Sequence, residues 1–175
     1  MDSVDQYSPE VRLLAQKINL PARCVRFGIT DLTRQNLSVA LPILIEHLNG
    51  LSSRFYEFLR HFPEIDRIFR SHDREVLRDR LQRHWVRVLQ GAYDEDYLLS
   101  SLMTGYAHYR AHVPPHMYMA GYNYFLSSFL QVLASEYYGN EFTAATSTVS
   151  KVIMFDMSNS LTAFMVSALH GDERE

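Results

Sequence analysis

The sequence is poor in the residues that build loops and cross-links. Glycine occurs 7 times and proline 6 times in 175 residues, and the only cysteine is Cys24. So little glycine and proline excludes a glycine-rich loop protein and a disordered chain. One cysteine can form neither an internal disulfide nor a cysteine-built zinc or iron–sulfur site. We therefore expect a single packed domain.

An excess of charge of one sign is also missing. The formal net charge is −3 and the sequence pI is about 6.2, so nothing in the composition favours binding to nucleic acid or to an anionic membrane. The first residues, MDSVDQYSPE, are acidic and polar, unlike a signal peptide. No uncharged apolar stretch reaches the roughly 18 residues that a membrane span needs. These features predict a soluble, cytoplasmic protein with no nucleic-acid partner and no membrane partner.

Apolar residues, in contrast, make up 47% of the chain, and most recur at helical spacing. No segment shows the two-residue alternation of a surface strand bounded by hairpin signals. The pattern predicts an all-α fold of about seven or eight helices without a sheet. The later helices are expected from Pro63 and over residues 73–90, 94–113, 116–138 and 141–169.

Proline positions predict several helix boundaries. Ser8 followed by Pro9 is typical of a helix start, and we expect Pro21 to end this first helix. A short connector is then expected over residues 23–30. The next apolar stripe keeps its helical period for about thirty residues, and we expect Pro42 to divide or bend it, because proline removes a backbone donor.

The last two expected helices carry almost no charge. Between residues 116 and 138 the only charged residue is Glu136, and between residues 151 and 170 only Lys151 and Asp156 are charged. Helices that are apolar all round are buried. They lie either in the core of one subunit or in a four-helix interface between two copies. We favour a homodimer formed through these two helices.

Histidines supply the main candidate for chemistry, since GxGxxG, GxxxxGK[ST], GxSxG and HExxH motifs are all absent. His108 follows an apolar stripe, and His112, four residues later, is expected on the same side of the helix. Three interpretations remain open. The two are packed or surface histidines, or they form a zinc pair that lacks further ligands, or one of them is the axial ligand of a haem iron.

Several motifs stand in a fixed order along the chain: RFYEFL at 54–59, FPE at 62–64, LQRHW at 81–85, HYR at 108–110 and PPHMY at 114–118. Over about residues 8–169 this order resembles the sensor domain of globin-coupled sensors, which are relatives of the protoglobins. The most specific part is the His-x-Arg sequence followed by a proline pair and a tyrosine three residues beyond it.

The resemblance implies a globin-like sensor fold with an extra N-terminal helix and no D helix. It also implies three parts: an N-terminal extension with a short helix at 1–30, a globin sensor domain at 31–170 and the start of a linker at 171–175. The linker would lead to an absent C-terminal output domain, a diguanylate cyclase or a chemotaxis transducer, of which we expect the cyclase. The sensor domain itself would not be catalytic.

The cofactor implied by the resemblance is haem b (iron protoporphyrin IX). His108 resembles the proximal iron ligand, which leaves the other face of the iron open to O2, CO or NO. Tyr118 resembles a tyrosine that hydrogen-bonds near this histidine, and Tyr56 aligns with the distal tyrosine that donates to bound O2. The remaining residues expected at the haem are Phe69, Leu77, Leu81 and Met103.

Two departures from the family pattern bear on this assignment. His112 stands where a small residue is common, and Met117 where a tryptophan is frequent. His112 therefore competes with His108 as the candidate iron ligand. The expected function is gas sensing, in which the ligand shifts a packing equilibrium at the dimer interface. The alternatives are a free-standing haem globin for O2 binding or NO and redox chemistry, and a haem-free helical dimerisation module.

Overall fold

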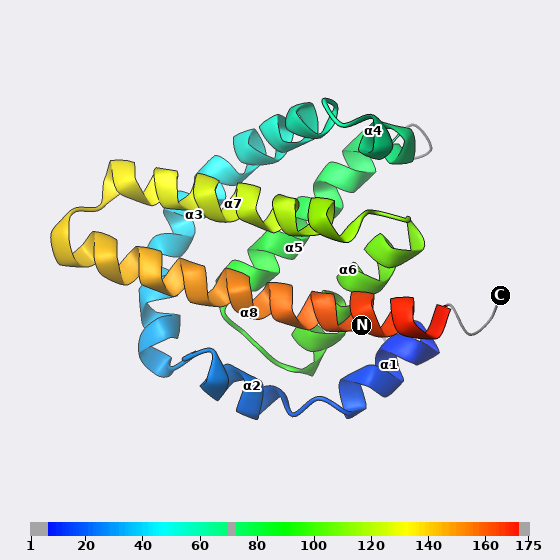
Figure 1. The fold of residues 1–175 in the computed structure, drawn as a ribbon. Coiled ribbons are helices and arrows are strands. Elements are labelled where there is room, and N and C mark those ends of the chain that lie inside the picture. Colours follow the sequence, from blue (N-terminus) through cyan, green and yellow to red (C-terminus); the bar gives the residue numbers. More distant parts are fainter. Residues whose placement is uncertain (1–6, 70–72, 172–175) are drawn as a thin grey trace.

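A computed structural model describes residues 7–69 and 73–171, and all regular elements in these two ranges are α-helices. The all-α prediction is confirmed, with eight helices in the described part of the chain (Figure 1). Residues 172–175, most of the expected linker, lie outside the described ranges. The helices are α1 (Pro9–Gln16), α2 (Leu20–Arg26), α3 (Asp31–Leu59), α4 (Pro63–Phe69), α5 (Arg74–Gln90), α6 (Glu95–Arg110), α7 (Pro115–Glu136) and α8 (Gly139–Gly171).

Most helix starts follow from short side chains that cap the first turn. Ser8 accepts a hydrogen bond from the backbone of Val11, with Pro9 in the first turn of α1. Asp73 and Asp94 cap α5 and α6 in the same way. Such oxygen atoms satisfy backbone N–H groups that have no partner within the helix. The caps fix where α5 and α6 begin, and so where their side chains point.

The prediction for Pro21 was wrong. This proline does not end α1 but lies in the first turn of α2, which Asn19 caps by accepting from the backbone of Ala22. Proline suits this position because the first N–H groups of a helix need no partner within it. The expected connector over residues 23–30 is therefore helical as far as Arg26.

The long apolar stripe forms one helix, α3, which runs through Pro42 without interruption. This helix changes direction along its length (Figure 1). Of the two outcomes expected for the segment around Pro42, the structure therefore shows a bent helix and not two separate helices. The missing proline N–H costs one helical hydrogen bond. Burial on one side of α3 offsets this cost, since Leu37, Leu44 and Leu48 are all part of the main core.

The centre of the fold is α8. It runs antiparallel to α7 on one side and packs against α6, α3 and α5 on others (Figure 1). By length and composition, residues 139–169 of α8 would be apolar enough to cross a membrane, but 44% of the most apolar window is buried inside the fold. Val149, Val152 and Ile153 of this helix are completely enclosed. Burial in the core accounts for part of its apolar composition.

Candidate functional site

His108 lies in the last turn of α6, with its ring orientation set by a backbone contact. The distance from its Nδ1 to the carbonyl oxygen of Thr104 is 2.8 Å. A carbonyl oxygen can only accept, so Nδ1 carries the proton and Nε2 keeps its lone pair. Burial lowers the pKa of His108, the backbone contact to Thr104 opposes this, and the charge of His84 lowers it further. A neutral imidazole with a free Nε2 is the form that binds a metal ion.

His112 does not share this side of the helix, contrary to the expectation from spacing. Helix α6 ends at Arg110, and His112 has φ +54°, in the left-handed region, with an exposed side chain. Chain direction therefore changes between the two histidines. In the described ranges no group of three or more His, Cys, Asp or Glu residues could hold a metal ion. The arrangement gives no support to a zinc pair or to His112 as a competing ligand.

Tyr118 of α7 packs against the ring of His108, and the two ring centroids are 4.5 Å apart. Its side chain is 5% exposed, and burial raises its pKa above the usual value. The hydroxyl lies near Ser160 and Tyr122 but has no hydrogen-bond partner within the described part of the chain. A buried phenol without a partner is uncommon. The structure thus brings His108 and Tyr118 together through their rings.

Tyr56 of α3 is the second tyrosine expected at the site. It is half-buried, and its ring meets that of Phe69 edge-on with a centroid distance of 5.3 Å. Burial raises the pKa of Tyr56 to about 12, against the opposing effect of the Arg78 charge. At neutral pH the phenol is therefore protonated and able to donate a hydrogen bond.

The other expected lining residues lie at the edge of the apolar interior. Leu77, Leu81 and Met103 are each half-buried, and the last two pack against the main core. A smaller cluster is built around Leu59, Ile65 and Met117, with Tyr56 and Phe69 against it. Side chains of Phe55 and Val113 touch both clusters. Tyr56 and Phe69 thus lie against the smaller cluster, and Leu81, Met103 and Tyr118 belong to the main one, while Leu77 is part of neither.

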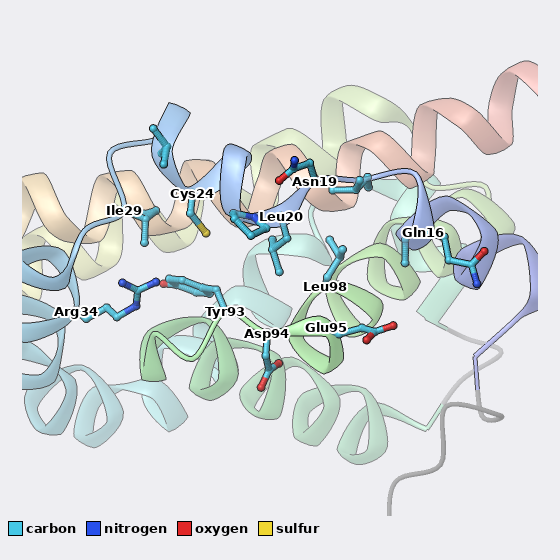
Figure 2. A pocket seen from close by; sticks show the side chains of 14 residues that line it. Gln16, Asn19, Leu20, Cys24, Ile29, Arg34, Tyr93, Asp94, Glu95 and Leu98 are labelled. Carbon is cyan, nitrogen blue, oxygen red and sulfur yellow. The ribbon is translucent and has the colours of Figure 1, made fainter.

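A pocket of about 690 Å³ lies elsewhere, between α2 and the start of α6 (Figure 2). None of the predicted site residues lines it. Two of its charged groups have structural roles, because Arg34 pairs with Asp31 at 3.0 Å and Asp94 caps α6. Volume alone would select this pocket, but it has no arrangement of groups suited to a metal or to catalysis.

Sequence analysis missed a polar cluster around Asp156, which it recorded only as an isolated charge. The carboxylate is fully buried and accepts hydrogen bonds from Tyr97, Ser101 and Tyr122, and the Nε2 atom of His84 lies 3.0 Å from Oδ2. A lone acidic residue in an apolar helix was the available signal, since buried charges need partners. The partners themselves are spread over three other helices.

Comparison with known protein families shows to which family the chain belongs. Residues 19–167 match the protoglobin family, a region that includes α3 to α7 complete and most of α8. The chain belongs to the protoglobin family. This confirms the family suggested by the order of motifs, and within this protoglobin the expected iron ligand and distal tyrosine both lie inside the matched region.

Solved structures agree with this protoglobin assignment at the level of the fold. The globin domain of the Geobacter sulfurreducens globin-coupled sensor superposes with a TM-score of 0.78 at 18% identity, covering 84% of this chain and 98% of that one. The ferric globin domain of E. coli DosC gives 0.70 at 20% identity, covering 81% and 99%. No curated protein sequence matches significantly. The globin-like sensor fold expected from the sequence is confirmed.

Proposed function

We propose that this protoglobin is a gas-sensor domain that binds O2, CO or NO at a haem b held by His108. The observation that carries the proposal is the 2.8 Å contact between Nδ1 of His108 and the carbonyl oxygen of Thr104, which leaves the lone pair on Nε2. When bound, haem would supply a ferrous iron able to take up a diatomic gas. One of the matched structures is the globin domain of a protein named as a globin-coupled sensor.

The chain's other site residues fit this group by their chemistry. Phe69, Leu77, Leu81 and Met103 offer apolar surface that excludes water from a flat cofactor. Tyr118 restricts rotation of the His108 ring through the ring contact, and its hydroxyl supplies a polar group next to the ligand. Tyr56 supplies a hydrogen-bond donor on a different helix from His108.

An absorption spectrum tests the proposal directly. The purified protein, reduced without oxygen and then exposed to O2 and to CO in separate samples, is expected to show a Soret band that shifts with each gas. Absence of a Soret band after addition of haem would exclude the proposal. It would leave the haem-free dimerisation module as the function to test.

Replacing Tyr56 by phenylalanine is expected to speed O2 dissociation at least tenfold and to change CO dissociation much less. O2 carries more negative charge when bound than CO does, so it gains more from a phenol donor. One charge-assisted hydrogen bond contributes roughly 1.5–3 kcal/mol. Stopped-flow dissociation rates for the two gases provide the measurement, and equal effects on both would contradict a donor role for Tyr56.

We also propose that the domain is a cytoplasmic homodimer through α7 and α8 that signals to a C-terminal output module, a diguanylate cyclase. Support for the interface comes from apolar side chains left exposed on these helices: Met119, Met154, Met165 and Leu169. Contiguous exposed apolar surface marks interaction sites, and the helical spacing of Met154, Met165 and Leu169 places them on one side of α8. Support for an output module comes from the matched sensor's name. A natural reading frame that ends at residue 175 would favour a free-standing haem globin.

Replacing Met165 by glutamate is expected to weaken self-association at least tenfold, because the side chain is 60% exposed in the single chain and would become buried in the dimer. Sedimentation analysis over a range of concentrations measures the effect. The matched control is Val25→Glu on α2, where the side chain is 76% exposed. Equal weakening by both variants would contradict an interface on α8.

A further inference from the structure

The buried carboxylate of Asp156 on α8 contacts side chains from three other helices, α5, α6 and α7. Tyr97 and Ser101 of α6 each donate to Oδ1 at 2.8 Å. Tyr122 of α7 donates to Oδ2 at 2.7 Å, and Nε2 of His84, on α5, lies 3.0 Å from the same oxygen. Asp156 itself is in the middle of α8 and 0% exposed. The carboxylate therefore connects α5, α6 and α7 to the central helix.

The donors keep Asp156 ionised in spite of its burial. Burial raises its pKa, but the charge of His84 and hydrogen bonds from His84, Tyr122 and Ser101 outweigh this effect, and the pKa is held below its ordinary value. Removal of the partner of a buried charge is costly, because the charge is then left uncompensated. Loss of the His84 side chain therefore changes how Asp156, and with it α8, is held.

His84 differs from the other donors in the helix that carries it, since it is the donor on α5. It lies one helical turn beyond Leu81 on α5, and Leu81 is one of the residues proposed to line the haem. Tyr97 and Ser101 belong to α6, the helix that carries His108 itself. Among the described donors, His84 is thus the one that ties α5 to α8.

We propose that the contact between His84 and Asp156 couples the gas-binding site to α8. The inference rests on the proposed haem function and adds a residue pair through which a change in the arrangement of α5 and α6 reaches the central helix. A gas ligand that alters the arrangement of α5 and α6 favours one of two states, in which the contact between His84 and Asp156 is either formed or broken. Helix α8 is held differently in these two states. Met154 and Met165, exposed on the same helix, would carry the difference to a partner.

Hydrogen–deuterium exchange of α8 tests the coupling. Peptides that contain Asp156 are compared in the ferrous protein with and without CO, for the natural chain and three variants. His84→Leu removes the donor, His84→Gln keeps an amide that can donate, and Tyr97→Phe removes a donor to the same carboxylate from α6. The CO-induced difference in α8 is expected to fall at least fivefold in His84→Leu, the lower end of ordinary allosteric couplings. The CO-induced difference is expected to persist in His84→Gln and in Tyr97→Phe.

Two controls separate the possible outcomes. A CO-shifted Soret band in each variant shows that the gas still binds, and exchange in the haem-free proteins shows whether His84→Leu loosens α8 near Asp156 by itself. A CO-induced difference that survives in His84→Leu, or that Tyr97→Phe removes to the same extent, would overturn the coupling. If the natural chain has no Soret band, the proposed function fails, and this inference fails with it. A normal Soret band with unchanged coupling overturns the inference alone.

Discussion

Replacing His108 by alanine is expected to abolish the five-coordinate ferrous spectrum. The substitution removes the imidazole whose free Nε2 is fixed by the contact between Nδ1 and Thr104. Changes to groups around a metal ligand commonly cost 10–100-fold in affinity, so loss of the ligand itself is expected to lower haem affinity by more than about 100-fold. Haem titration and the ferrous absorption spectrum measure the two effects.

His112→Ala is the matched control for this experiment. His112 is exposed, has a left-handed backbone and lies beyond the end of α6, so its loss is expected to leave the spectrum unchanged. Added imidazole is expected to restore a five-coordinate spectrum in His108→Ala, because it can enter the space left by the side chain. Loss of the spectrum in His112→Ala but not in His108→Ala would reverse the assignment.

The sequence predicted most of the fold because helix-forming information is local. Periodic apolar residues located the long helices, and Asp73, Asp94 and Gly91 stand at the ends of α5 and α6 as capping residues should. Pro21 misled the prediction because proline is compatible both with the end of one helix and with the first turn of the next. Local signals therefore gave the helices but not every boundary.

The candidate site was predictable only in part. His108, Tyr118 and Tyr56 came from a family resemblance, and the structure adds the contacts that place His108 against Thr104 and Tyr118. Spacing wrongly placed His112 on the same side, because the i, i+4 rule applies only while the helix continues. The turn at Ala111 cannot be read from periodicity alone.

The donors to Asp156 could not have been predicted from spacing. They stand at positions 84, 97, 101 and 122, and only the packing of four helices brings them to one carboxylate. Local propensity carries no information about such contacts. A lone charge in an apolar helix indicates that partners exist, but the identity of these partners depends on the tertiary structure.

The close packing of α6 on α8 also depends on one residue that sequence periodicity does not single out. Gly105 lies on α6 one turn before His108, and a Cβ atom added there would overlap the backbone carbonyl of Ser160 on α8. Backbone atoms cannot rotate away as a side chain can. The two helices must therefore move apart to accept any larger residue, and α6 is the helix that positions His108.

Replacing Gly105 by alanine is expected to lower the free energy of unfolding by about 3 kcal/mol, the upper end of the usual cost of overpacking, as measured by urea denaturation. Gly50→Ala is the control, because Gly50 is also inside a helix and its added Cβ would meet only the flexible tip of Arg54 at 3.3 Å. Alanine is favoured over glycine in helices by roughly 0.5–1 kcal/mol, so this variant is expected to be more stable than the natural chain. Equal stability of the two variants would show that α6 and α8 can separate at little cost, and that the position of His108 does not depend on their contact.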